Sequence, residues 1–247
     1  MGGATDIKLI VDGKRLDGRT AEQLRNIRIE VGMIPEAEGS AFIEWGGNKI
    51  LCGVHGPRQC LPKHMANPYK AVIKCRYMMS PFASLEEHGR SGPSRRSTEL
   101  SKVIKDVFEN VILAEQFPNT QIEMYIDVLQ ADGGTRTASI AVAAVALANA
   151  GIPMKDMVSA VAVGKGGDQL IVDLGKLEDN FGQSDMPLAV SARNKDLLLV
   201  QMDGLLTREE IEKILEMAEK SADEVHKLQV KALKDHYSGE KEEEFKL

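Results

Sequence analysis

Hydrophobic and polar residues alternate through the first third of the chain, the two-residue period of a strand with one buried face. The pattern starts at residues 27–31 and recurs at residues 39–45 and 49–54. Gly46-Gly47-Asn48 predicts a hairpin turn between the last two segments. A further apolar stretch covers residues 71–78. We therefore expect the chain to open with an antiparallel sheet, preceded by a polar arm.

The period changes after residue 94, where apolar residues three and four positions apart predict an amphipathic helix that ends near Phe117-Pro118. Residues 121–129 alternate again as a strand. Residues 135–150 are alanine-rich and apolar on nearly every side, which predicts a helix buried between layers and closed by Gly151.

The second half partly repeats the first. Strands are predicted at residues 158–163, 169–174, 188–191 and 197–202, and a long amphipathic helix begins at Thr207. This order indicates an α+β fold, with mixed sheets and helices packed on one side. The division falls near residues 151–157, which gives an N-terminal half (1–150) and a C-terminal half (151–247) around one core.

The composition is that of a folded, soluble protein, with 43% hydrophobic and 28% charged residues in a chain of 247. No uncharged apolar run approaches a membrane span, and the first ten residues are too polar for a secretory signal. We expect a cytoplasmic protein without membrane contact. The net charge of −6 means that any binding of nucleic acid must be local or shared with a partner.

The first candidate site is Ser94-Arg95-Arg96-Ser97 at the start of a predicted helix. Two arginines there have the wrong sign for the helix dipole. They are either solvated surface residues or, together with the helix N–H groups, a site for an anion such as phosphate.

The second candidate is Asp132-Gly133-Gly134-Thr135-Arg136-Thr137, between a strand and the buried helix. Its glycines let a ligand approach the backbone closely. The segment lacks the GxxxxGK(S/T) spacing of a Walker nucleotide-binding loop. It is either a plain Asp-Gly turn or a second anion site.

The third candidate is a predicted acidic loop at residues 178–187, with Asp179 and Asp185 six residues apart. One carboxylate could bind a divalent cation and the other donate a proton, with Asp173 as a further metal ligand. The alternative is an acidic surface loop. Arg58, Lys63 and Arg76 could form a basic track, with Tyr77 and Phe82 stacking on bases.

Taken in order, several segments resemble the ribonuclease PH family, and within it the catalytic members of the archaeal exosome core. They are RLDGR, GSAFIEWGGNKILCGVHGPR, CRYMMSPFA, GPSRRSTELSKVI, LQADGGTRTASI, GIPMKDMVSAVAVG and EDNFGQSDMP. They extend from about residue 15 to about residue 235. The resemblance implies the ribonuclease PH fold, which is ribosomal protein S5 domain 2-like.

The resemblance also implies a reaction, phosphorolytic 3′→5′ cleavage of single-stranded RNA that releases nucleoside diphosphates. Inorganic phosphate would be the co-substrate and Mg²⁺ the metal. Phosphate contacts fall on Arg95, Arg96, Gly134, Thr135 and Arg136. Catalytic and metal functions fall on Asp179 and Asp185, and RNA contacts on Arg58, Lys63, Arg76 and Arg136. Many relatives have arginine at the position of Lys63. Lysine keeps the positive charge but lacks the bidentate fork of the guanidinium.

The implied assembly is a hexameric ring in which three such chains alternate with three non-catalytic relatives, under RNA-binding caps. The alternatives are a stand-alone homohexameric ribonuclease PH that trims tRNA 3′ ends and a non-catalytic RNA-binding ring scaffold. A small-molecule phosphotransferase is the weakest reading, because the chain has no recognisable nucleotide loop.

Overall fold

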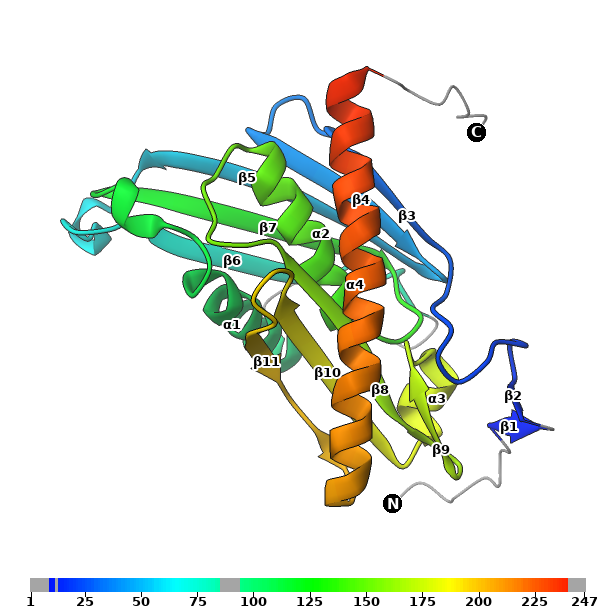
Figure 1. Ribbon diagram of the computed structural model, residues 1–247. Helices are drawn as coiled ribbons and strands as arrows, with labels where there is room; N and C mark the ends of the chain where they lie inside the picture. The colour runs from blue at the N-terminus through cyan, green and yellow to red at the C-terminus, as the bar shows by residue number, and fades with distance from the viewer. Residues whose placement is uncertain (1–8, 12, 85–93, 240–247) are drawn as a thin grey trace.

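The computed structural model describes residues 9–11, 13–84 and 94–239 and forms two sheets joined by buried helices (Figure 1). A short hairpin of β1 (Ile10–Val11) and β2 (Lys14–Arg15) belongs to the polar arm. Two 3-10 turns, η1 (Lys63–Met65) and η2 (Ala114–Gln116), lie in connections. Within the described part of the chain, no helix is long and apolar enough to cross a membrane.

The N-terminal sheet has five strands in the order β3-β4-β5-β7-β6. Their bounds are β3 (Ile27–Val31), β4 (Gly39–Trp45), β5 (Asn48–Gln59), β6 (Val72–Met79) and β7 (Thr120–Gln130). The antiparallel prediction is confirmed for β3, β4 and β5 but is wrong for β6, which pairs in parallel with β7. The reason is the helix α1 (Arg95–Glu109), which carries the chain back between these two strands.

The C-terminal sheet is antiparallel, in the order β11-β10-β8-β9, with β12 paired to β10. Its strands are β8 (Val158–Gly166), β9 (Gln169–Val172), β10 (Ser184–Ser191), β11 (Leu197–Val200) and β12 (Asp203–Gly204). β10 starts earlier than the sequence pattern predicts, and this places Asp185 in a strand rather than in a loop. The acidic segment is therefore part of the sheet.

The second correction in this segment is α3 (Lys176–Phe181), where the sequence analysis places Asp179 on a loop. One and a half turns are too short to show a helical period. The start of the helix is held by Glu178, which accepts from the N–H of Gly175 three residues earlier and is bound in turn by Arg15 from the distant arm. Asp179 thus projects from the first turn of a helix.

The apolar helix α2 (Thr135–Asn149) is buried as predicted, with contacts to β4 and β5 of one sheet and β8 of the other. The long helix α4 (Arg208–Ser238) crosses both sheets, packing on β8 and β3 (Figure 1). One hydrophobic cluster includes Ile43, Ile126, Val158 and Val225 and so joins the two sheets. This α+β arrangement, with mixed sheets and packed helices, agrees with the predicted fold class.

Candidate active site

A polar pocket of about 350 Å³ lies where the starts of α1 and α2 approach α3 and the beginning of β10. The side chains that matter for its chemistry are two arginines facing a group of carboxylates. It is lined by Arg96, Glu99, Gly134, Thr135, Arg136, Thr137, Ala162, Asp179, Asp185, Pro187, Gln201, Met202 and Asp203. The pocket therefore combines parts of all three candidate motifs.

The first wall is the start of α1, where Ser94 is the N-cap. Its hydroxyl accepts from the N–H of Ser97 at 3.0 Å, and the Ser97 hydroxyl accepts from the N–H of Ser94 at 2.8 Å. No acidic residue lies in this first turn to balance Arg95 and Arg96. Both arginines are exposed, but Arg96 lines the pocket and Arg95 is not among the lining residues. The neighbouring arginines therefore have different surroundings.

The second wall is the start of α2. Gly133 and Gly134 have φ of 74° and 68°, a left-handed conformation that side chains rarely adopt. Gly134 is the N-cap, and no side chain caps the helix. The N–H groups of the first turn, together with the side chains of Thr135 and Arg136, make a site that suits an anion. The sequence expectation of an anion site fits this geometry.

The third wall is the acid pair, Asp179 from α3 and Asp185 from β10. Loss of water around the carboxyl raises the pKa of Asp179. The pKa of Asp185 rises to about 7, first through burial and then through the nearby charge of Asp179, to which it is hydrogen-bonded. Arg136 acts in the opposite direction at both carboxyls. The pair therefore retains a proton near neutral pH.

The sequence analysis missed three polar residues of the pocket, Glu99, Gln201 and Asp203. Asp203 is the cross-strand partner of Asp185 in the pairing of β12 with β10, and its charge adds to the rise in the pKa of Asp185. Gln201 follows β11, and its buried side-chain oxygen has no hydrogen-bond partner among the described residues. In the sequence, Asp203-Gly204 is typical of a turn, and the pairing that brings Asp203 opposite Asp185 cannot be read from it.

The acid pair fits a divalent cation. Two carboxyls in direct contact repel each other when ionised, and a cation between them removes that repulsion. Among the residues described, no group of three or more histidine, cysteine or acidic side chains could hold a metal ion. A cation here would complete its shell with water and substrate oxygens, which is the usual habit of Mg²⁺.

The predicted base-stacking function of Tyr77 is wrong, because the side chain is 1% exposed beneath the pocket. Its hydroxyl donates to the Thr135 hydroxyl at 3.1 Å and is also in hydrogen-bond contact with Arg96. Tyr77 therefore supports two of the walls. Phe82 is 75% exposed and remains available for stacking.

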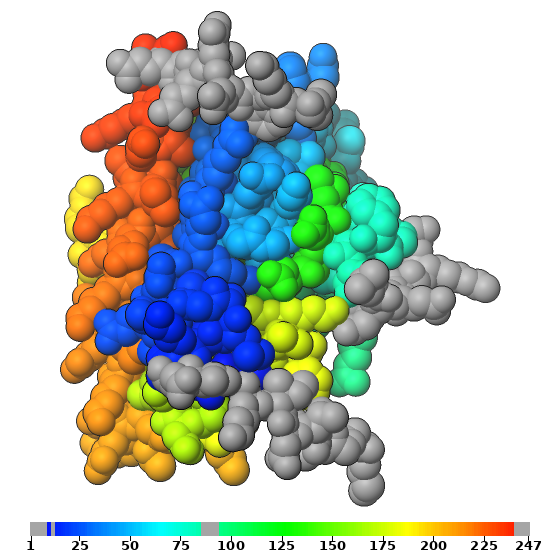
Figure 2. All heavy atoms as spheres, turned by 90° about the vertical axis from the view of Figure 1, so that its right-hand side faces the viewer, coloured from blue at the N-terminus to red at the C-terminus, as the bar shows by residue number. Residues whose placement is uncertain are grey.

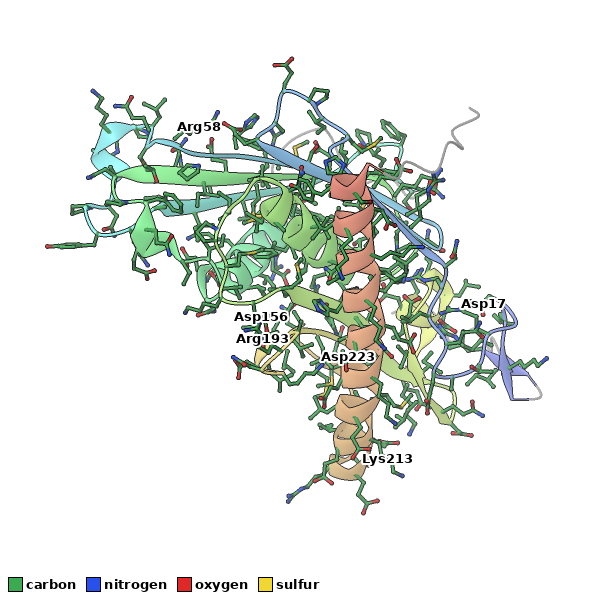
Figure 3. All side chains as sticks on the ribbon, turned by 45° about the horizontal axis from the view of Figure 1, so that its top comes forward. Asp17, Arg58, Asp156, Arg193, Lys213 and Asp223 are labelled. Atoms are coloured by element: carbon green, nitrogen blue, oxygen red, sulfur yellow. The ribbon has the colours of Figure 1, made fainter. Side chains whose placement is uncertain are left out.

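Of the predicted RNA-binding residues, the structure brings only Arg136 into the pocket. Arg58 forms an ion pair with Glu123 on the N-terminal sheet (Figure 3). Lys63 lies in the exposed turn η1, and Arg76 is exposed on β6, in contact with the Met78 sulfur. None of these three residues lines the pocket that holds the acid pair.

Comparison with known proteins adds independent information. A profile described as "3′ exoribonuclease family, domain 1" matches residues 23–153, and the profile of domain 2 matches residues 156–221. The chain is 49% identical over 238 residues to the exosome complex component Rrp41 of Thermococcus onnurineus, with 96% of this chain and 95% of the relative covered. The protein of that name from Nitrosopumilus maritimus is 47% identical over 243 residues, covering 98% and 99%.

Solved structures give the same fold. The crystal structure of rice Rrp46 superposes with a TM-score of 0.80 at 25% identity and covers 89% of this chain and 100% of that one. A chain of the Archaeoglobus fulgidus exosome with RNA bound to its active site matches with a TM-score of 0.76 at 23% identity, covering 87% and 92%. The second match bears on fold alone.

Proposed function

Because the chain belongs to the 3′ exoribonuclease family across both of its domains, we propose that it is a phosphorolytic 3′→5′ exoribonuclease and the catalytic subunit of an archaeal-type exosome. One observation carries the phosphorolytic part. Arg96 and the uncapped start of α2, which suit inorganic phosphate, lie in the same pocket as the acid pair. A hydrolase would have no need to hold a free anion there.

In the proposed reaction an oxygen of inorganic phosphate attacks the terminal phosphodiester of a single-stranded RNA. A new P–O–P bond forms and the bond to the 3′ oxygen of the preceding nucleotide breaks, so that a nucleoside diphosphate leaves. Arg96, Arg136 and the N–H groups of α2 hold two anions close together and offset their repulsion. The reverse reaction adds nucleotides to the same 3′ end.

The departing 3′ oxygen needs a proton, and the acid pair is the source in this proposal. Family resemblance points to Asp179, and the raised pKa of Asp185 keeps one proton on the pair near neutral pH. Mg²⁺ held by the ionised carboxylate of the pair, while the other carboxyl keeps its proton, would offset charge on the scissile phosphate. Asp203 lies opposite Asp185 in the adjacent strand and also lines the pocket, and its charge helps Asp185 to hold a proton or a cation.

The proposal includes partners. The relatives are named as exosome components, and apolar side chains are exposed along β11 and the turn after it. These side chains are Leu197, Val200, Met202 and Leu205. A chain with net charge −6 binds RNA better when a neighbour shares the task. We propose a cytoplasmic ring of three such chains and three non-catalytic relatives, with RNA-binding caps.

The test is degradation of a 3′-tailed single-stranded RNA with Mg²⁺, with and without inorganic phosphate, by the chain alone and with a non-catalytic partner. The proposal predicts nucleoside diphosphates that depend on phosphate and vanish in Asp179→Ala. Nucleoside monophosphates released without phosphate would mean hydrolysis and would overturn the phosphate assignment. RNA binding without turnover under all conditions would favour the scaffold.

A further inference from the structure

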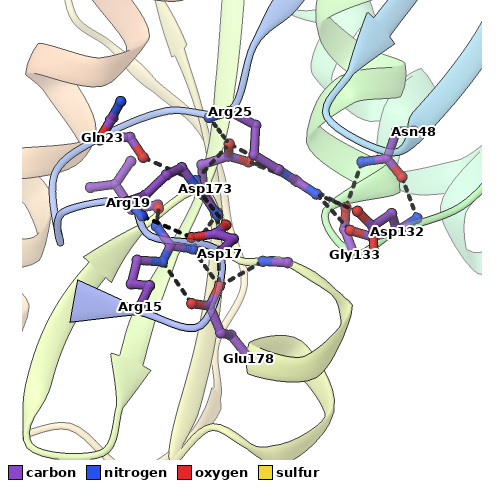
Figure 4. Close-up of polar contacts among 12 residues, drawn as sticks. Arg15, Asp17, Arg19, Gln23, Arg25, Asn48, Asp132, Gly133, Asp173 and Glu178 are labelled. Atoms are coloured by element: carbon purple, nitrogen blue, oxygen red, sulfur yellow. Dashed lines mark hydrogen bonds and ion pairs between the residues drawn. The ribbon is translucent and has the colours of Figure 1, made fainter. Parts of the chain in front are cut away.

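Three arginines of the N-terminal arm converge beneath the pocket in a buried cluster (Figure 4). We call Arg15, Arg19, Arg25, Asp173 and Glu178 the arginine cluster. The side chains of all five are less than 10% exposed. The arm itself lies over this face of the molecule, beside the yellow segment that includes α3 (Figure 2). Two of these arginines belong to RLDGR, a motif that the proposed chemistry leaves without a function.

Asp173 is the centre of the arginine cluster. Its φ of 56° is rare for a residue with a side chain and persists only where the surroundings enforce it. Its backbone oxygen accepts from Arg15 at 2.8 Å and from Arg19 at 3.2 Å. Its carboxylate accepts from the N–H and the guanidinium of Arg25 at 2.7 and 2.6 Å. Burial alone raises the pKa of Asp173, but these bonds from Arg25 keep it below the usual value.

The same guanidinium of Arg25 reaches the segment at residues 132–136, which we call the phosphate loop. Nη1 donates to the backbone oxygen of Asp132 at 2.6 Å, and Nη2 donates to that of Gly133 at 3.3 Å. From the opposite side, the Asn48 amide donates to the oxygen of Gly133 at 2.6 Å. The backbone just before α2 is therefore held by side chains from two distant segments.

The arginine cluster also holds the helix that carries Asp179. Arg15 donates to both carboxylate oxygens of Glu178, and Glu178 caps the N–H of Gly175 at 2.8 Å. The phosphate loop touches this helix directly, since a Cβ at Gly133 would lie 2.6 Å from the carbonyl carbon of Gly175. The two catalytic walls thus meet backbone to backbone, directly above one set of ion pairs.

From this geometry we propose that Arg25 is a positioning residue that sets the affinity for inorganic phosphate. Its guanidinium bonds Asp173 on one side and the carbonyls of Asp132 and Gly133 on the other. These bonds fix the phosphate loop against the start of α3. The inference rests on the proposed function. Buried ion pairs contribute little net stability but do impose one geometry. A guanidinium can serve the carboxylate and both carbonyls at once, whereas an ammonium cannot.

The test is Arg25→Lys, which keeps the charge opposite Asp173 and removes the fork. We expect the KM for phosphate in phosphorolysis to rise about tenfold or more, with the KM for RNA changed by less than about twofold. Calorimetric titration with inorganic phosphate alone, which needs no turnover, is expected to show the same loss of affinity. That titration keeps the inference testable if wild-type chain releases no diphosphate.

The matched control is Val225→Ala, which removes core volume in α4 away from the pocket and lowers stability without touching the arginine cluster. It is expected to leave phosphate affinity unchanged. If Arg25→Lys does not fold, Arg25→Gln replaces it, because its amide also lacks the fork and Asp173 keeps its ion pair with Arg19 at 3.3 Å. Wild-type phosphate affinity in the folded variant would make the arginine cluster purely structural and overturn the inference.

Discussion

Residues of the same type at the pocket differ in their contacts and in their pKa values, because their surroundings differ. Arg95 and Arg96 are neighbours at one helix start, yet only Arg96 lines the pocket, where it also contacts the Tyr77 hydroxyl. Asp179 lies near Arg96 and Arg136, and Asp185 lies near Arg136, yet burial outweighs this attraction and raises both pKa values. At Asp185 the charge of Asp179 adds to the rise. The proposed chemistry depends on this balance of charges rather than on any one side chain.

The arginine pair provides a prediction with an internal control. Arg96→Gln removes a charged donor from the phosphate site, and kcat/KM for phosphate is expected to fall roughly a hundredfold. Arg95→Gln changes the same type of residue at the same helix start, outside the pocket, and is expected to lower it less than about threefold. Steady-state kinetics with varied phosphate measure both. Equal losses would show that the two arginines share the site.

The acid pair predicts a pH-dependent cost in stability. The pKa of Asp185 is about 7 in the folded chain and 3.8 as the ordinary value, so protonation favours folding. Its contribution is full at pH below about 4 and is lost as the pH rises through about 7. Asp185→Asn is therefore expected to be more stable than wild type at pH 8, by a few degrees in Tm, and to lose that advantage at pH 5.

Thermal unfolding in metal-free buffer at the two pH values measures this effect. Asp156→Asn, in a loop far from the pocket, serves as the control and is expected to show no such reversal with pH. If Asp185→Asn were less stable than wild type at pH 8, the claim that ionised Asp185 destabilises the folded chain would be contradicted.

Helices and strands with a long periodic pattern could be predicted from the sequence. The elements that form the pocket could be predicted only in part. β3, β4 and α2 were expected within a residue of their bounds, because each buries a regular face. α3 has six residues and depends on Arg15, which lies 163 positions from Glu178. The glycine-rich loop could be identified as an anion site by its composition, but its contact with α3 is a tertiary feature that no local pattern contains.

That contact between elements gives a prediction at Gly133. Gly133 and Gly151 both have φ above 70°, so alanine at either position costs about 1–2 kcal/mol in backbone strain. A Cβ at Gly151 has nothing within 4 Å, whereas one at Gly133 would strike the backbone of Gly175 and Lys176. We expect Gly133→Ala to lose about 1–3 kcal/mol more and to weaken phosphate binding as well.

Chemical denaturation and phosphate titration of the two alanine variants provide the measurement. Gly151→Ala is expected to keep full affinity for phosphate despite its strain. Similar losses of stability and affinity at both positions would mean that the backbone contact between the phosphate loop and α3 does not matter.

For the whole molecule, one core joins two sheets, and the pocket lies where elements of both halves meet. Each half contributes one side of the proposed chemistry: α1 and α2 bring the cations, and α3 and β10 bring the acids. Met202, at the pocket, and Leu205, close to it in the chain, are exposed apolar side chains, and the proposed ring neighbour would cover them. The net charge of the sequence indicates that RNA binding is shared with a partner chain, but it does not show which surface the partner contacts.

This view predicts the behaviour of the isolated chain. Alone it is expected to be smaller than a hexamer by light scattering and weakly active on RNA, and a non-catalytic family partner is expected to raise both mass and activity. Met202→Ser and Leu205→Ser, both on the exposed rim, are expected to weaken that gain. A homohexamer with full activity would instead favour the stand-alone ribonuclease PH.

The central claim is that inorganic phosphate is the nucleophile, and tracing its phosphorus tests this most directly. The assembled protein is incubated with a 3′-tailed RNA, Mg²⁺ and radiolabelled inorganic phosphate, and the nucleotide products are separated. The account predicts that the label appears in the β-phosphate of the released nucleoside diphosphates, one label per nucleotide removed. Unlabelled nucleoside monophosphates as the only product would contradict it.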